Sequence, residues 1–117
     1  MKTAQEHIDS LDLSVIKEKL TMPNIAGGYE WSEQEVEQAI SAYRQFLKEV
    51  LNYRMQDQNA PSDIGPDPDP VVDIVWHTHI LFTQKYHEDC ANIFGEYIHH
   101  MPRVDPIPSG QHNPIES

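Results

Sequence analysis

Histidine and cysteine side chains gather in one stretch of this chain. Residues 67–102 hold five of the seven histidines and the single cysteine, Cys90. Imidazole and thiolate bind borderline-soft metal ions well, and histidine is also the side chain whose charge changes near neutral pH. Metal or acid–base chemistry is therefore expected in this stretch.

The direction of each of these side chains depends on the local fold. On a helix of about 3.6 residues per turn, His79 falls in an apolar stripe, whereas Asp73 and His77 fall on the opposite side. His77 and His79 would share one face only in a strand, and the β-branched opening at 71–75 leaves a short strand as the competing interpretation. The apolar stripe of the helical interpretation consists of Val72, Val75, His79, Phe82, Tyr86, Cys90 and Ile93.

A metal site can be built on the polar side of such a helix. Asp73 precedes His77 by about one helical turn, so its carboxylate can share an ion with the imidazole or orient it. Gly95 allows the chain to turn back, and an imidazole from the segment that follows could complete the site. The sequence thus predicts a divalent transition metal, zinc first, with iron and copper as alternatives. The predicted ligands are His77, His99, His100 and Asp73, followed by Cys90, His79 and His87.

Each of these residues also has a structural interpretation. His79 and Cys90 lie on the apolar stripe and fit a hydrogen-bonded core histidine and a small buried hydrophobe. His99 and His100 could cap the end of the preceding helix. The spacing matches no short metal motif, such as His-Glu-x-x-His or paired Cys-x-x-Cys. Ligand types favour metal binding, but their spacing leaves it open.

Two helices are predicted before this stretch. Residues 11–22 have apolar side chains at helical spacing, with Ser10 or Asp12 as the N-cap. A second start is marked by Ser32 and Glu35, which form a capping box, and by the flanking hydrophobic staple of Trp31 and Val36. Apolar residues then recur every three or four positions, which predicts one long helix over 33–55.

The histidine-rich stretch itself is predicted to form a third helix. Asp69 and Pro70 resemble an N-cap followed by proline in the first turn, and the helix should continue to Ile93 or Phe94 and stop at Gly95. Four prolines prevent a regular element over 56–70. The fold class is mainly α, a small bundle of three to four helices. A single domain is predicted over 1–104, with an extended or disordered tail over 105–117.

Charge and composition limit the classes of binding partner that we expect. Eight Lys and Arg stand against 19 Asp and Glu, a net charge of −11. This field disfavours nucleic acid and anionic membranes and is compatible with a cation or a basic peptide or protein. With one cysteine, no apolar signal-peptide core and no apolar run of roughly 20 residues, we expect a soluble, cytoplasmic protein without an internal disulfide. The oligomeric state is left open.

An ordered set of residues within 70–102 resembles the glycine-rich-domain-containing-protein-like family, especially its small bacterial members. The resemblance rests on the runs Asp-Ile-Val-Trp-His at 73–77 and Ile-His-His-Met-Pro at 98–102, with residues in between. It implies no reaction. It marks as motif positions Asp73, Trp76, His77, Tyr86, Cys90, Gly95, His99 and His100.

Two functional hypotheses follow from the sequence. The first is a small metal-binding protein with a histidine-centred site, which would be an enzyme acting on a peptide or small molecule if a coordination position were open. The second is a non-catalytic acidic interaction module or accessory protein in which the histidine, cysteine and tryptophan residues are structural. The sequence does not decide whether the protein is an enzyme.

Overall fold

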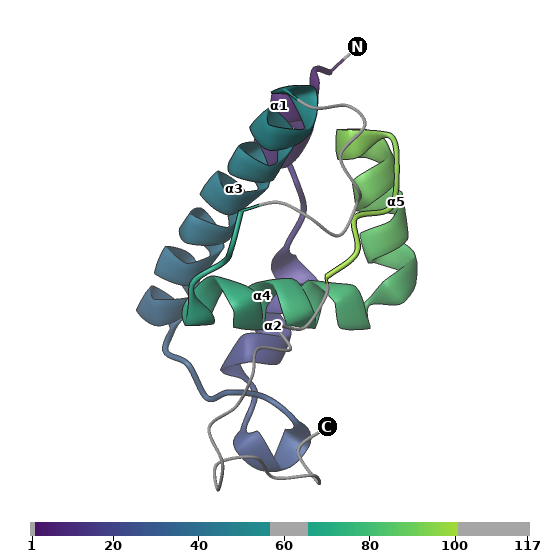
Figure 1. Cartoon of the computed structure of the whole chain (residues 1–117). Coiled ribbons are helices and arrows are strands. Elements are labelled where there is room, and N and C mark those ends of the chain that lie inside the picture. The colour runs from purple at the N-terminus through teal and green to yellow at the C-terminus, as the bar shows by residue number, and fades with distance from the viewer. Residues whose placement is uncertain (1, 57–65, 101–117) are drawn as a thin grey trace, which may run out of the picture.

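The longest helix, α3 (Glu33–Gln56), provides the surface against which α1 (Ala4–Asp9), α2 (Ser14–Thr21) and α4 (Pro70–Leu81) pack (Figure 1). The remaining helix, α5 (Thr83–Phe94), contacts α1 and α4. This computed structural model describes residues 2–56 and 66–100, and in those ranges it contains five α-helices, one short 3-10 helix and no strand. The mainly helical single domain predicted from the sequence is confirmed.

The start of α3 is built as the sequence predicts. The Ser32 Oγ accepts a hydrogen bond from the Glu35 N–H (3.1 Å), and the Glu35 carboxylate accepts one from the Ser32 N–H (2.8 Å). These reciprocal bonds satisfy two N–H groups that have no partner inside the helix. The helix then runs without interruption to Gln56 and buries the apolar side chains of one face.

The first third of the chain differs from the prediction. The helix expected over 11–22 is shorter, and neither Ser10 nor Asp12 is its N-cap; Leu13 occupies that position, while Asp12 accepts hydrogen bonds from the Ser14 N–H and hydroxyl. Ser10 instead ends α1, a helix that the prediction omits. Its signal is present in the sequence, because Thr3 and Glu6 form a second capping box.

The third predicted helix is two helices. Pro70 follows the N-cap Asp69, whose carboxylate accepts from the Val72 N–H (2.9 Å), and Gly95 ends α5 in a left-handed conformation, as predicted. The prediction of an unbroken helix is wrong at Phe82, which ends α4 and precedes α5 with non-helical backbone angles. The break allows α4 to pack across α2 and α3 while α5 turns toward α1. The short strand at 71–75 is not formed.

The core lies between α3 and the other helices. The side chains with no exposed surface come from α1, α2, α3 and α4. Helix α5 contributes three further buried residues, Tyr86, Cys90 and Ile93. The predicted stripe is therefore buried despite the break, with Phe82 half-buried. None of the helices in the described residues is both long enough and apolar enough to cross a membrane. Most of the predicted proline-rich loop and all of the 105–117 tail lie outside the described residues.

Candidate functional site

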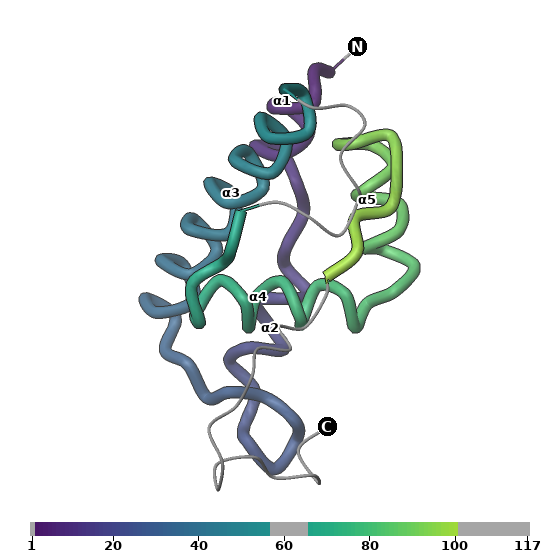
Figure 2. The backbone as a smooth tube through the Cα atoms, in the orientation of Figure 1, coloured from purple at the N-terminus to yellow at the C-terminus, as the bar shows by residue number. Residues whose placement is uncertain are grey.

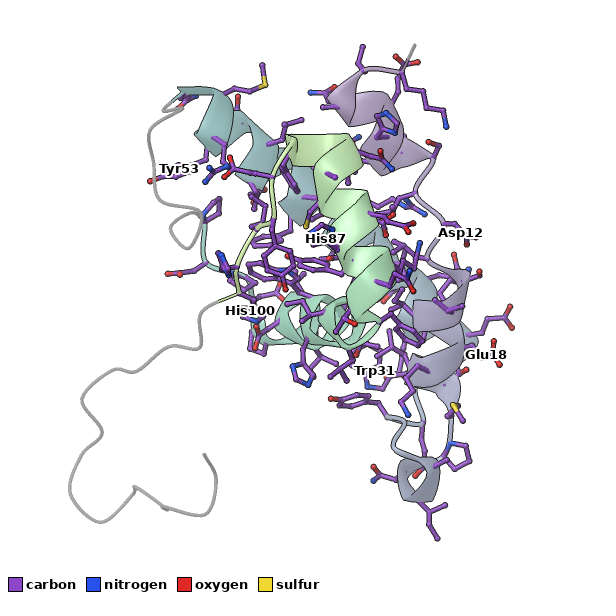
Figure 3. The ribbon with its side chains drawn as sticks, turned by 90° about the vertical axis from the view of Figure 1, so that its right-hand side faces the viewer. Asp12, Glu18, Trp31, Tyr53, His87 and His100 are labelled. Carbon is purple, nitrogen blue, oxygen red and sulfur yellow. The ribbon has the colours of Figure 1, made fainter. Side chains whose placement is uncertain are left out.

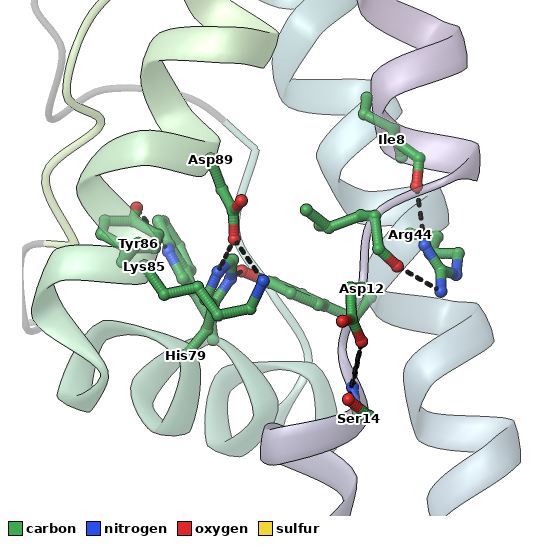
Figure 4. A network of polar contacts seen from close by, with 11 residues as sticks. Ile8, Asp12, Ser14, Arg44, His79, Lys85, Tyr86 and Asp89 are labelled. Atoms are coloured by element: carbon green, nitrogen blue, oxygen red, sulfur yellow. Dashed lines mark hydrogen bonds and ion pairs between the residues drawn. The ribbon is translucent and has the colours of Figure 1, made fainter.

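His79 occupies the centre of a buried polar network that joins three helices (Figure 4). It is 2 % exposed. Its Nε2–H donates to the Asp89 carboxylate (2.8 Å), and its Nδ1 lies 2.7 Å from the Tyr43 hydroxyl, which donates to it when the imidazole is neutral. Both ring nitrogens are therefore used within the protein, and neither is left to bind a ligand.

Asp89 connects this network to the surface. Its side chain is 13 % exposed and also receives the Lys85 ammonium at 3.1 Å. Burial alone would raise the pKa of the carboxyl group, but hydrogen bonds from His79 and Lys85 outweigh it and hold that pKa below its usual value. Asp89 is thus an ionised partner that fixes the orientation of the buried imidazole.

Tyr86 is the centre of a second network, formed where α4, α5 and the chain after α5 meet. Its hydroxyl accepts a hydrogen bond from the Trp76 indole N–H (2.9 Å) and donates to the Ile98 carbonyl (2.5 Å). Cys90 is buried beside it. Burial raises the pKa of the Cys90 thiol, although hydrogen bonds to the Ile98 backbone and Tyr86 act in the opposite direction. The thiol is therefore a neutral packing group, because the thiolate is the nucleophilic form.

The segment after Gly95 returns toward α4, as the chain path in Figure 2 shows. It brings His100 to this helix. The His100 ring stacks on the Trp76 indole, with centroids 4.0 Å apart and planes inclined by 2°. Its Nε2 lies 2.5 Å from an Asp73 carboxylate oxygen. Asp73 and His100 thus meet, as predicted for the metal site, but the indole occupies one face of the imidazole.

The other predicted ligands lie apart from this pair. His77 is exposed, and none of the described hydrogen bonds, ion pairs or ring contacts includes it. His87 and His99 are also exposed, and both rings contact Tyr97 (centroids 5.8 Å and 4.9 Å). Among residues 2–56 and 66–100, no three His, Cys, Asp or Glu side chains form a group that could hold a metal ion.

Three residues of the buried network were absent from the predicted site: Tyr43, Lys85 and Asp89. Tyr43 could be predicted to lie in the core from the periodicity of α3, but its bond to His79 spans 36 positions and has no local signal. Asp89 is separated from His79 by the break at Phe82, so an unbroken helix would place their side chains differently.

Two clefts between the helices are either small or lined by polar side chains that already have partners. Asp89 and Lys85 line a cleft of about 160 Å³ between α1 and α5, below the roughly 300–1,000 Å³ of ligand pockets. A cleft of about 340 Å³ lies where α2 approaches α3. There Lys17 pairs with Glu37, and the Arg44 guanidinium donates to the carbonyls of two earlier residues. Neither cleft is lined by any of the predicted metal ligands.

Comparison with known protein families finds a match over most of the chain. A model of the UCP032817-like family matches residues 6–113. The chain belongs to this family. The resemblance to the glycine-rich-domain-containing-protein-like family is therefore corrected, since the match that is found is to a different family. No curated protein and no solved structure matches the chain. Family membership adds no reaction or ligand to what the geometry gives.

Proposed function

We propose that this protein is a non-catalytic, acidic interaction module that binds a positively charged protein. The proposal rests on one observation: the positively charged side chains make their hydrogen bonds and ion pairs within the protein. Eight Lys and Arg are present, and all except Arg103 lie in the described residues. Each of these seven donates to an oxygen atom of the same chain.

The partners of these cations are distributed over the fold. Lys17, Lys48, Arg54 and Lys85 pair with carboxylates, whereas Lys2, Lys19 and Arg44 donate to a hydroxyl or to backbone carbonyls. A cation used in this way is less available to an anionic partner. Internal pairing therefore favours a partner whose own charge is positive.

Carboxylates, in contrast, are left at the surface. Four exposed glutamates have no hydrogen bond or ion pair through their side chains: Glu18, Glu33, Glu49 and Glu88. Charges of one sign attract a partner of opposite sign and raise its association rate, an effect that falls with ionic strength. A basic protein fits this distribution of charge better than a nucleic acid or an anionic membrane does.

The buried residues of the histidine-rich stretch support a structural role rather than catalysis. The polar atoms of Trp76, His79 and Tyr86 are paired inside the protein, and the Cys90 thiol is buried. Metal binding stays a prediction of the sequence, with zinc, iron or copper as candidates. Of the predicted metal ligands, Asp73 and His100 contact each other. Two side chains rarely form a complete metal site, so the interaction module is favoured.

The proposal is tested with a charge-neutral variant in which Glu18, Glu33, Glu49 and Glu88 are replaced by glutamine. The full chain is immobilised, proteins retained from a lysate of the source organism are identified, and the most enriched basic protein is purified. Its Kd is then measured against the wild type and the glutamine variant at two salt concentrations. A variant with aspartate at the same four positions keeps the charge and serves as the control.

We expect the glutamine variant to bind at least about tenfold more weakly, because attraction by four charges is removed, while the aspartate variant binds nearly as well as the wild type. Higher salt should weaken the wild type more than the glutamine variant. Retention of no basic protein, or equal affinity of both variants, would contradict the proposal. Stoichiometric zinc, iron or copper in untagged protein, lost together with thermal stability on chelation, would favour the metal site instead.

A further inference from the structure

A short loop projects from the helical body at the end opposite to α1. Residues 22–31, here called the finger loop, connect α2 to α3 and contain the 3-10 helix η1 (Asn24–Ala26). Figure 1 and Figure 2 show this loop extending below α2, beyond the helices that form the core. It takes no part in the histidine networks.

The backbone of the finger loop is fixed by its own hydrogen bonds. The N–H groups of Ala26 and Gly28 both donate to the Pro23 carbonyl (2.9 and 3.0 Å). At its base, the Glu30 N–H donates to the Met22 carbonyl (2.9 Å), and a further bond joins Trp31 to Leu20 (3.2 Å). A loop closed at both its tip and its base has one defined conformation to present.

Side chains reinforce this conformation. The Glu30 carboxylate accepts from the Asn24 N–H (2.9 Å), and the Lys19 ammonium donates to the Ala26 carbonyl (3.2 Å). A side chain at Gly28 would overlap the Met22 carbonyl, because a Cβ there would lie 2.2 Å from the oxygen. Glu30 has a φ of 55°, a left-handed conformation that costs free energy in a residue other than glycine. The local sequence therefore holds the loop in shape despite strain.

Ile25 stands at the tip of this rigid loop and is 98 % exposed. It is the most exposed large apolar side chain of the described residues. Met55 (68 %) and Leu81 (59 %) come next. Single exposed apolar residues are common on protein surfaces. An isoleucine held outward on a fixed loop differs because burying it in a partner would cost little conformational entropy.

Aromatic residues extend the surface from the tip toward the body. Tyr29 is exposed, and its ring contacts the half-buried Trp31, with centroids 5.7 Å apart. Figure 3 labels Trp31 beside α2, where its backbone N–H donates to the Leu20 carbonyl. Tyrosine and tryptophan are enriched at the energetic centres of protein interfaces. The finger loop thus combines a protruding aliphatic tip with an aromatic side.

Among the charged side chains that flank the finger loop, the two that have no partner within the described residues are negative. Glu18 and Glu33 are exposed on the helices that enter and leave it, and the one lysine of this region that contacts the loop, Lys19, is used on the Ala26 carbonyl. We propose that the finger loop inserts Ile25 into an apolar pocket on a basic partner protein, with lysines or arginines at the pocket rim facing Glu18 and Glu33. This inference rests on the proposed function and assigns its contact surface.

The experiment uses the full chain and the purified basic partner obtained above. The partner is titrated with the wild type, with Ile25→Ser and with Leu81→Ser, which removes a comparable exposed side chain elsewhere. Burial of an isoleucine should make the Kd of Ile25→Ser at least about tenfold larger, while Leu81→Ser stays within about twofold of the wild type. All three proteins should melt at the same temperature, because both side chains are exposed.

Three results would overturn this assignment. The first is an affinity of Ile25→Ser within twofold of the wild type. The second is binding of the wild type, but not Ile25→Ser, to phosphatidylcholine vesicles in a flotation assay. The third is self-association in sedimentation velocity that Ile25→Ser abolishes, since the occupant would then be a second copy. If the glutamine variant binds weakly while Ile25→Ser binds normally, only the finger-loop contact fails and the proposed function stands.

Discussion

The protein contains two histidine–aspartate pairs of similar chemistry in different surroundings. His79 and Asp89 are 2 % and 13 % exposed, whereas His100 and Asp73 are 17 % and 49 % exposed. The first pair joins α4 to α5 inside the core, and the second joins the chain after α5 to the surface of α4. The distances, 2.8 and 2.5 Å, do not rank them. Burial does, because it determines what each partner loses when the other is removed.

Water can replace a lost partner at the surface but not in the core. Removing an imidazole next to an exposed carboxylate leaves that carboxylate hydrated, and exposed pairs contribute about 0–1 kcal/mol. Removing it from the core leaves buried polar groups without their partner and opens a cavity, which together cost about 3–5 kcal/mol. The two pairs should therefore respond differently to the same substitution.

The largest effect is expected for His79→Ala. It leaves the buried Tyr43 hydroxyl without a partner, leaves Asp89 with Lys85 alone and creates a cavity, so the free energy of unfolding should fall by about 3–5 kcal/mol. Urea denaturation measures this loss. The exposed His77→Ala is the matched control and should change stability by no more than about 0.5 kcal/mol. Equal effects of the two substitutions would contradict the assignment of His79 to the core.

The second effect in size is expected for Tyr86→Phe. The ring remains, but the Trp76 indole N–H and the Ile98 carbonyl lose their shared hydroxyl. Leaving buried polar groups unpaired should lower the free energy of unfolding by about 1–3 kcal/mol. Tyr29→Phe removes a hydroxyl from an exposed ring and should leave stability nearly unchanged. If Tyr29→Phe lowered the free energy of unfolding and Tyr86→Phe did not, the assignment of Tyr86 to the buried network would be wrong.

The pH dependence of stability should reveal the contribution of the buried pair. The pKa of Asp89 is lower in the folded protein than its usual value of 3.8, so its contribution is present above that value and is lost as the pH falls through the folded pKa. The difference in unfolding free energy between the wild type and Asp89→Asn should therefore be large at pH 7 and shrink toward pH 3. Urea denaturation over this range measures it, and a difference that stays constant would exclude Asp89 as its source.

The sequence predicts the features of this fold that depend on local signals. Helical periodicity places α3 and the buried stripe that includes His79, and the Ser32–Glu35 pair marks the start of α3. The omitted α1 had the same kind of signal at Thr3 and Glu6. The break at Phe82 had none, because neither glycine nor proline marks it and the packing of α4 and α5 on different helices decides it.

The candidate site is predictable only in part for the same reason. Helical spacing correctly separates His77 from His79, and the turn at Gly95 brings His100 to Asp73 as expected. The spacing of Asp73 and His77 also suggested that these two side chains act together, yet Asp73 contacts His100. The stacking of His100 on Trp76 depends on how residues 95–100 dock against α4. That docking is a tertiary contact, which residue spacing does not encode.

The smallest effect is expected at the surface pair, and it can be divided into two parts. His100→Ala removes both the contact with Asp73 and the stack on Trp76, and should lower the free energy of unfolding by about 1 kcal/mol. His100→Phe retains an aromatic ring over the indole but no ion pair. If stacking supplies most of the stabilisation, urea denaturation should show His100→Phe close to the wild type and Asp73→Asn equally mild. A loss in His100→Phe as large as that in His79→Ala would mean that burial does not distinguish the two pairs.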